Sequence, residues 1–306
     1  MAMTDGLKRL RRTALGRRLW NLRHVGGSLL NVRPGHFYSP VPDPDDVLRY
    51  WHDPDHGHAT PSLPGIGTDL AAERALWESW AGFRADPGPA LAPARRQRFR
   101  LQGNRHYAMG DALVYESMLR GTRPRRLIEI GSGFSTALAL DTFDAAGLEW
   151  PRVTLVEPYP ALVTSLLKPG DVERIAIIGQ PVQAVGPDLV AGLEPDDILF
   201  IDSTHVAKTG SDVLHELFTL LPAVQPGVHV HFHDVFWPFE YPRAWAVDGN
   251  YGWNELYFLR AFLTDNPNWR ITFFADHFAK LARDEIAPVL AQTGGDLGGG
   301  LWLTRR

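Results

Sequence analysis

The chain has 306 residues, enough for one large domain or two ordinary ones, and its 44% hydrophobic and 22% charged content is typical of a soluble globular protein. The net charge of -4 gives no general attraction to nucleic acid, and the lack of cysteine excludes disulfides, thiolate metal sites and cysteine nucleophiles. No apolar run approaches the ~20 residues that span a bilayer, and the N-terminus lacks the apolar core of a secretory signal, so we expect a cytoplasmic protein.

The first two dozen residues are basic and carry leucines near helical spacing. Such a helix can lie on an anionic membrane surface or on a partner, but a solvated or frayed terminus is the better interpretation. A second polar stretch, HDPDHGH over residues 52–58, carries His52, His56 and His58. We interpret it as a solvated loop, because nothing there fixes the ligand geometry that a metal needs.

Helices are expected over 69–84 and 104–120, separated by a Pro/Gly/Ala linker over 86–94. We place a domain boundary at this linker. Residues 1–94 then form a helical and proline-rich extension, a candidate for homo-oligomer contacts, and residues 95–306 form the main domain.

Beyond residue 125 the pattern alternates between strands and helices. Strands are expected at 126–131, 153–157, 174–179, 197–202, 227–234, 269–275 and 300–304. Helices are expected at 135–146, 160–167, 182–192, 211–221 and 254–264. This alternation predicts an α/β fold with a doubly wound, mainly parallel Rossmann-like sheet.

The first of these strands ends in a glycine turn, Gly131-Ser132-Gly133, and Ser135-Thr136 open the following helix. This layout brings backbone N–H groups and a positive helix end up to a ligand. The third glycine of the dinucleotide fingerprint is missing, and many turns need glycine only for positive φ, so the motif alone is weak evidence.

Glu157 ends the next strand, 24 residues after Gly133. A carboxylate at that point can accept hydrogen bonds from the two ribose hydroxyls of a nucleoside cofactor, although it can also cap the helix that follows. The glycine turn and Glu157 are also compatible with NAD as the cofactor. Glu129 within the first strand and the short turn fit a ligand with a single nucleoside better.

Asp202 and Asp234 end two strands that should be neighbours, so their carboxylates could converge. They could hold a magnesium-type ion through hard oxygen ligands. Alternatively, His205 could take a proton while Asp202 orients its ring. The structural alternative is that Asp202 helps to cap the following segment and Asp234 caps a turn.

Three histidines, His229, His231 and His233, alternate on one face of the expected strand 227–234. A parallel strand is usually covered on both faces, so His229 and His231 are interpreted as buried, hydrogen-bonded core residues. His233, at the end of the strand, is a catalytic candidate.

Aromatic residues follow directly in VFWPFEYP, residues 235–242, and continue with Trp245, Tyr251 and Trp253. Two prolines make this segment rigid. It could form the apolar wall of an acceptor pocket, or it could pack against the N-terminal region and close the core.

Four stretches, LIEIGSGFST, VTLVEP, DILFIDSTH and VHFHD, together resemble the successive motifs of class I S-adenosylmethionine-dependent methyltransferases. They look most like the bacterial branch whose first motif reads E-I-G-S-G-x-S-T. The resemblance covers about residues 104–306. It implies a seven-stranded sheet of order 3-2-1-4-5-7-6 whose last strand, near 301–303, is antiparallel.

The resemblance also implies S-adenosylmethionine as the cofactor and assigns its contacts. The residues implied are Glu129, Gly131, Ser132, Gly133, Ser135, Thr136, Glu157, Gln180 and Asp202. Asp202 and Asp234 fall where the catechol O-methyltransferase-like members place acidic metal ligands, which implies Mg²⁺. This chain departs from those members, because Val235 replaces their asparagine and His205 and Lys208 stand near the position of their lysine base.

We therefore expect an enzyme that methylates a hydroxyl of a small molecule, sugar or natural product, with N-methylation left open. His205 or His233 would be the base, and Asp202 and Asp234 would orient that base or a metal. Two alternatives stay open. The chain could be a nicotinamide-dependent oxidoreductase on the same fold, or a non-catalytic protein that binds the cofactor and a partner.

Overall fold

The computed structural model describes residues 32, 35–52, 60, 62–104 and 106–306. The basic N-terminal helix expected from the sequence lies outside these described residues, as do His56 and His58. Within the described ranges, every helix is too short or too polar to span a bilayer.

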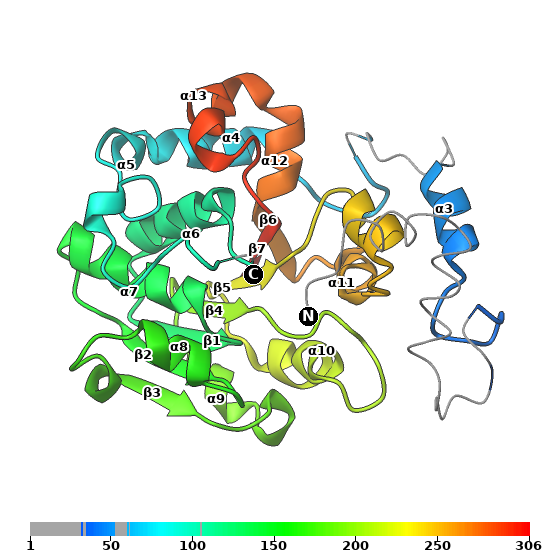
Figure 1. Ribbon diagram of the computed structural model, residues 1–306, viewed down its shortest axis with the longest axis horizontal. Coiled ribbons are helices and arrows are strands. Elements are labelled where there is room, and N and C mark those ends of the chain that lie inside the picture. Colours follow the sequence, from blue (N-terminus) through cyan, green and yellow to red (C-terminus); the bar gives the residue numbers. More distant parts are fainter. Residues whose placement is uncertain (1–31, 33–34, 53–59, 61, 105) are drawn as a thin grey trace.

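A seven-stranded sheet forms the centre of the fold, in the order β3-β2-β1-β4-β5-β7-β6 (Figure 1). Its strands are β1 (Arg126–Ile130), β2 (Arg152–Val156), β3 (Ile175–Ile178), β4 (Ile198–Ile201), β5 (His229–His233), β6 (Trp269–Phe274) and β7 (Gly300–Arg305). The first five strands in this order run parallel, and β7 runs antiparallel to β5 and β6. The predicted fold class and strand order are confirmed.

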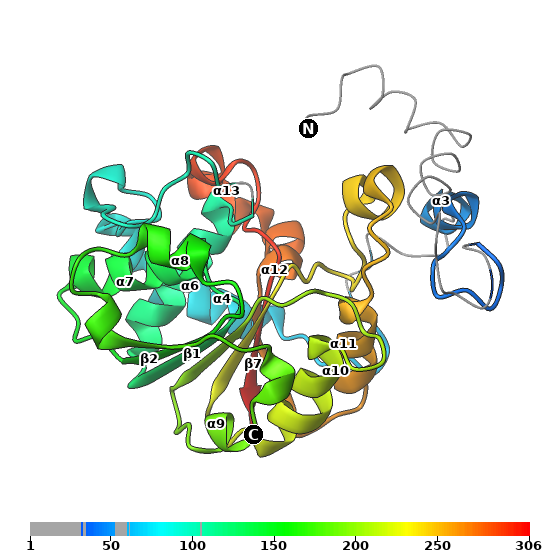
Figure 2. The same ribbon diagram turned by 60° about the horizontal axis from the view of Figure 1, so that its bottom comes forward.

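Helices cover both faces of the sheet, so the domain has three layers (Figure 2). The helices of one layer are α4 (Leu70–Ser79), α5 (Ala81–Ala85), α6 (Met109–Thr122), α7 (Phe134–Ala146), α8 (Ala161–Leu166), α12 (Ala275–Leu281) and α13 (Arg283–Thr293). The other layer has α9 (Asp188–Ala191), α10 (Asp212–His215) continuing as the π-helix η5 (Glu216–Leu220), and α11 (Glu255–Leu263). Short 3-10 turns lie at Pro93–Arg95, Val172–Arg174, Val182–Ala184 and Leu221–Ala223.

Successive strand residues point into opposite layers, which gives the chain two hydrophobic cores. In β1, Leu127 packs in the core with α6 and α7, whereas Ile128 and Ile130 pack in the core with α10 and α11. Because both faces of each central strand are buried, the strands read as nearly continuous apolar runs in the sequence.

Residues before the expected boundary at 94 share the first of these cores. The Trp77 and Trp80 rings lie with their centroids 6.5 and 5.1 Å from that of Phe273 in β6. A separate boundary at 94 stays a prediction, since no observation separates residues 70–94 from the packing of the main domain. Helix α3 (Pro44–His52) lies apart from the sheet and packs against the π-helix η7 (Ala244–Gly249) (Figure 2).

The helix expected over 182–192 is wrong. This segment forms only a 3-10 turn at Val182–Ala184 and the short α9, with Gly186 and Pro187 between them. Proline lacks the N–H that a continuous helix needs, and glycine disfavours the helical state, so the segment turns twice instead.

Candidate active site

A cavity of about 370 Å³ opens beyond the carboxyl ends of β1, β4 and β5. In an open parallel sheet, this edge is where ligands bind. The predicted site residues that line it are Ser132, Gly133, Ser135, Asp202, His205, His233 and Asp234. The volume falls in the range of roughly 300–1,000 Å³ that is typical of small-molecule sites.

Gly131 lets the ends of β1 and β4 approach each other closely. Its φ is 78°, and a Cβ at this position would lie 2.0 Å from the carbonyl oxygen of Asp202. The backbone N–H of Asp202 in turn donates to the carbonyl of Ile130 at 2.8 Å. Only glycine meets both conditions, so the turn and Asp202 are fixed as one unit.

Glu129 lies beneath the glycine turn and is fully buried. The hydroxyl of Thr136 donates to one carboxylate oxygen, and that of Tyr115 donates to the other at 3.2 Å. Burial raises the pKa of Glu129 to about 7, although these hydrogen bonds favour the ionised form. The residue faces α6 and does not line the cavity, so its contact with a cofactor stays a prediction.

Glu157 connects the ends of β1 and β2. Its carboxylate accepts hydrogen bonds from the backbone N–H groups of Ser132 at 3.0 Å and Tyr159 at 2.8 Å. Gln180 is exposed after β3. Neither Glu157 nor Gln180 lines the 370 Å³ cavity, and their contacts with ribose and adenine stay predictions.

His205 brings the two aspartates together. Its Nε2 lies 3.6 Å from Oδ1 of Asp202 and 3.6 Å from Oδ2 of Asp234, and its Nδ1 lies 2.8 Å from Oε2 of Glu255. Burial alone would lower the pKa of His205, but the hydrogen bond and charge of Glu255 and the charges of both aspartates raise it. Both His205 (φ 60°) and Asp234 (φ 58°) have a left-handed backbone, a conformation found more often at functional sites than elsewhere.

Glu255, which was not among the predicted site residues, lies closer to the His205 ring than Asp202 does. The short hydrogen bond to His205 comes from Glu255, the first residue of α11. Two further bonds hold the loop after β4 to this helix: Glu255 N–H donates to the carbonyl of His205 at 3.2 Å, and Ala207 N–H donates to Asn254 Oδ1 at 2.7 Å. The sequence gives little sign of this contact, because it joins distant segments.

His233 is almost fully buried at the end of β5. Its Nε2 lies 3.5 Å from Oδ1 of Asp234 and 3.3 Å from the carbonyl of His106. Burial would lower its pKa, but the charges of Asp234, Asp202 and Asp111 raise it to about 9. At neutral pH this ring is therefore protonated and stabilises the aspartate beside it.

The two core histidines behave differently. His229 is buried and shares a hydrogen bond of 2.9 Å with Thr304 Oγ1, as predicted. His231 is also buried, but neither ring nitrogen has a hydrogen-bond partner among the described residues. Its ring packs between Phe200 and Trp302 with centroids 4.3 and 4.5 Å away, and burial holds its pKa well below the ordinary value. The predicted hydrogen bonding of His231 is wrong.

The donor set does not fit a metal ion. Among the described residues, no group of three or more His, Asp or Glu side chains could hold one. Where Asp202 and Asp234 converge, the ring of His205 lies between them. Once this ring takes up a proton, its positive charge offsets the repulsion of the two carboxylates.

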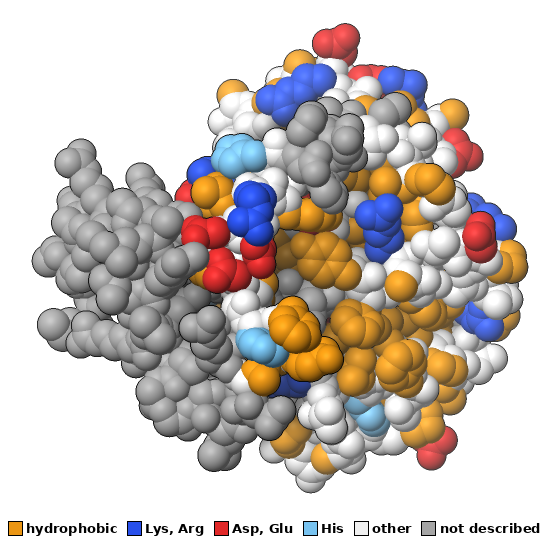
Figure 3. Space-filling view, turned by 90° about the vertical axis from the view of Figure 1, so that its right-hand side faces the viewer, with side chains coloured by type: hydrophobic (Ala, Val, Ile, Leu, Met, Phe, Trp, Pro, Cys, Tyr) orange, Lys and Arg blue, Asp and Glu red, His pale blue; other side chains and the backbone are white. Residues whose placement is uncertain are grey.

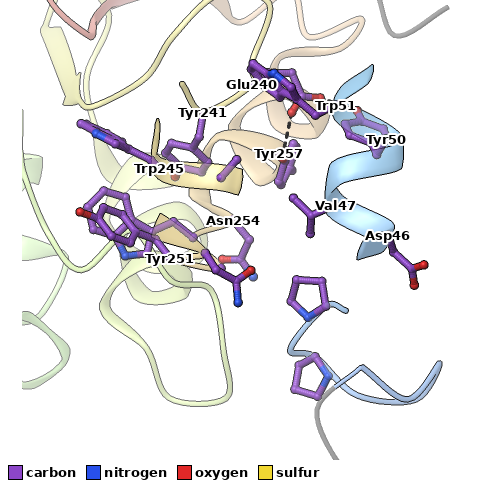
Figure 4. A pocket seen from close by; sticks show the side chains of 16 residues that line it. Asp46, Val47, Tyr50, Trp51, Glu240, Tyr241, Trp245, Tyr251, Asn254 and Tyr257 are labelled. Carbon is purple, nitrogen blue, oxygen red and sulfur yellow. Dashed lines mark hydrogen bonds between the residues drawn. The ribbon is translucent and has the colours of Figure 1, made fainter. Parts of the chain in front are cut away.

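The aromatic segment after β5 divides between core and cavity. Trp237 and Phe239 are buried in the core, whereas Tyr241, Trp245 and Trp253 line a second cavity of about 390 Å³. Figure 4 shows this cavity with α3 on one side and the η7–α11 segment on the other. Part of the segment therefore closes the core, as one alternative predicted, whereas an acceptor pocket formed by the remaining aromatic residues stays a prediction.

Trp253 links the two cavities, because it lines both. Its ring centroid lies 4.6 Å from that of His205. Trp253 therefore lies in the wall that the aromatic cavity shares with the cavity containing the aspartates and His205.

Residues 128–235, from β1 to the end of β5, match the family model described as a methyltransferase domain. The match spans the glycine turn, Asp202, His205 and Asp234, and ends before Glu255. Together with the sheet order, the match supports a class I methyltransferase domain. The match favours the first of the three functions expected from the sequence over an oxidoreductase.

The chain belongs to the same family as an uncharacterized protein from Archaeoglobus fulgidus, with which it is 30% identical over 170 residues, 54% of this chain and 75% of that protein. Among solved structures, an S-adenosylhomocysteine-bound Podospora anserina methyltransferase is 16% identical, with a TM-score of 0.41 over 86% of this chain and 94% of that one. A putative O-methyltransferase from Klebsiella pneumoniae is 17% identical, with a TM-score of 0.44 over 77% and 96%. At these identities and scores, neither structure says anything about the chemistry of this chain.

Proposed function

We propose that the chain transfers the methyl group of S-adenosylmethionine to a hydroxyl of a small-molecule acceptor. The observation that carries this proposal is the position of His205. Its Nε2 faces two carboxylates inside a cavity that also contains the glycine turn. A base and a nucleoside site at one sheet edge are what methyl transfer to oxygen needs.

S-adenosylmethionine would bind beside the turn from Gly131 to Ser135. Glu157 would accept hydrogen bonds from the ribose, and Gln180 would border the adenine. The N-terminus of α7, which begins at Phe134, adds a positive end to the turn. The sulfonium methyl group would then point toward His205 and Asp234.

In the transfer step the acceptor oxygen attacks the methyl carbon in line with the bond to sulfur. The C–O bond forms as the C–S bond breaks, and the sulfur leaves as neutral S-adenosylhomocysteine. The hydroxyl proton moves to Nε2 of His205. The products are a methyl ether, S-adenosylhomocysteine and an imidazolium ion that releases its proton to solvent.

The carboxylates around His205 favour this proton transfer. Glu255 fixes the ring by its bond to Nδ1, and Asp202 and Asp234 stabilise the positive charge that forms. A general base contributes about 10²- to 10⁴-fold to a rate. His233 is assigned a positioning role, because its raised pKa leaves it protonated and paired with Asp234.

The mechanism uses no metal ion. A Mg²⁺ ligand role for Asp202 and Asp234 remains a prediction from the resemblance, and the surrounding donor set argues against it.

Methyl-labelled S-adenosylmethionine and a small-molecule cell extract test the proposal without knowledge of the acceptor. The wild type should release S-adenosylhomocysteine and label an extract component. His205→Gln should be slower by about 100-fold or more while binding S-adenosylhomocysteine normally. Undiminished turnover in this variant, or no product from the wild type with any extract, would contradict the proposal.

A further inference from the structure

The 390 Å³ aromatic cavity between α3 and the η7–α11 segment is a separate feature from the cavity beside the glycine turn. Rings line it from both sides: Tyr50 and Trp51 from α3, and Tyr241, Trp245, Tyr251, Trp253 and Tyr257 from the opposite segment. Figure 3 views the molecule from this side, where hydrophobic side chains gather beside acidic ones. Tyr251 and Tyr257 are large aromatic side chains that are exposed to solvent, and a cluster of such residues indicates a binding surface.

One carboxylate lies among these rings. Glu240 is 7% exposed, and the hydroxyls of Tyr50 and Tyr257 donate to its two oxygens, the latter at 2.9 Å. Figure 4 shows Glu240, Tyr50 and Tyr257 together at one end of the cavity. Hydrogen bonds from neutral hydroxyls satisfy the oxygens but bring no positive charge to the carboxylate.

In the part of the chain that the structure describes, Glu240 forms no ion pair with a basic side chain. The hydrogen-bond partners of its two oxygens among the described residues are the hydroxyls of Tyr50 and Tyr257. The charge of Arg260 acts on Tyr50, but Arg260 does not line the cavity. Burying an ionised carboxylate without an opposite charge is costly, so a cationic ligand would be favoured here.

The rings favour the same ligand for a second reason. The face of a tyrosine or tryptophan ring carries negative potential and attracts a positively charged group. Tyr257 and Tyr241 have centroids 6.4 Å apart, and Tyr241 and Trp253 have centroids 5.8 Å apart. These rings form a continuous aromatic path from Glu240 to Trp253, which touches His205.

We propose that this cavity binds a positively charged nitrogen group, an ammonium or quaternary ammonium, held between Glu240 and the aromatic rings. The rest of the ligand extends past Trp253 toward His205. The methyl acceptor is then a cationic small molecule, with its reacting hydroxyl apart from its charged nitrogen. Only this last step rests on the proposed function, since the cation site itself depends on the cavity alone.

Choline and its neutral isostere 3,3-dimethyl-1-butanol are suitable probes, since they differ in charge and hardly in shape. Binding to the full chain can be followed by tryptophan fluorescence, because Trp51, Trp245 and Trp253 line the cavity. Choline should bind saturably, and the isostere about tenfold or more weakly. Equal binding of the two probes, or no binding of choline, would overturn the proposal.

Two variants locate the site. Glu240→Gln should weaken choline binding by about tenfold or more and leave the isostere unaffected, whereas Glu194→Gln, at an exposed carboxylate far from the cavity, should change neither. Tyr251→Leu should weaken choline by about two- to fivefold, and Tyr251→Phe, which keeps the ring, should not. Unchanged choline binding in both Glu240→Gln and Tyr251→Leu would refute the assignment.

S-adenosylhomocysteine separates this inference from the proposed function. Its affinity should be the same in Glu240→Gln and the wild type, because Glu240 does not line the cavity beside the glycine turn. A chain that binds choline but not S-adenosylhomocysteine would keep the cation site and lose the methyltransferase mechanism. A chain that binds S-adenosylhomocysteine but not choline would be consistent with the proposed mechanism and would overturn the cation site.

Discussion

His205 Nδ1 lies 2.8 Å from Oε2 of Glu255, and this bond joins two residues that are 50 positions apart in the chain. It leaves Nε2 free to face Asp202, Asp234 and the cavity. Fixing one ring nitrogen through a buried carboxylate sets which nitrogen can accept a proton. In the proposed mechanism, the bond therefore gives His205 a defined direction as the base.

Glu255→Gln should slow methyl transfer by at least about tenfold, because the ring loses its orientation and part of its basicity. The carboxylate raises the pKa of His205, so its loss should move the acid limb of the pH–rate profile to lower pH. Rates measured across pH with Glu194→Gln as control test this. A slower variant with an unmoved acid limb would mean that Glu255 does not act on the titration of His205.

Asp234→Asn should lower the pKa of His233 from about 9 toward the ordinary histidine value. Burial favours the neutral ring, and Asp234 provides the first of the charges that oppose it. Asparagine tolerates the left-handed backbone at this position, so the fold should survive. NMR titration of the imidazole nitrogens measures the change, and a midpoint that stays near 9 would rule out this pairing.

Gly131→Ala should destabilise the chain by about 2 kcal/mol or more, because the new Cβ meets the Asp202 carbonyl at positive φ. Gly147→Ala is a matched control. Gly147 also has a positive φ, 61°, but a Cβ there meets nothing within 4 Å, so its cost should be about 1 kcal/mol. Urea denaturation compares the two. Equal losses would show that the close approach of β1 and β4 contributes nothing.

Glu129→Gln should make stability less dependent on pH. The folded-state pKa of about 7 lies above the ordinary value of 4.5, so the folded chain binds more protons than the unfolded chain between these values. Stability contributed by this group therefore falls as pH rises through that window, by about 3 kcal/mol in total. Urea denaturation at about pH 5 and about pH 8 measures this. The difference between the two pH values should shrink in the variant, and an unchanged difference would disprove the assigned pKa.

The sequence predicted the sheet well because its strands are buried on both faces. Continuous runs such as Ile198–Ile201 leave little ambiguity, and the acids that follow them mark the carboxyl ends. Segments with a less regular hydrophobic pattern were harder to predict. Nothing was expected over 276–293, where most of α12 and all of α13 lie, and Ala275, expected to end a strand, begins α12. Pro288 inside α13 argues against a helix on local grounds. Tertiary packing overrides that preference.

The candidate site was only partly predictable. Strand ends placed Asp202, Asp234 and His233 at one edge correctly, since they follow from the topology alone. The contact between His205 and Glu255 does not follow from the topology, because it depends on how α11 packs against the loop after β4. The same holds for Glu240, whose role depends on α3 packing against the η7–α11 segment.

Calorimetric titration of the full chain with S-adenosylhomocysteine, and separately with NAD, tests the central claim most directly. One equivalent of S-adenosylhomocysteine should bind, NAD should give no heat of binding, and Gly131→Ala should lose the S-adenosylhomocysteine signal that Gly147→Ala retains. Binding of NAD without binding of S-adenosylhomocysteine would contradict a methyltransferase cofactor site at the glycine turn.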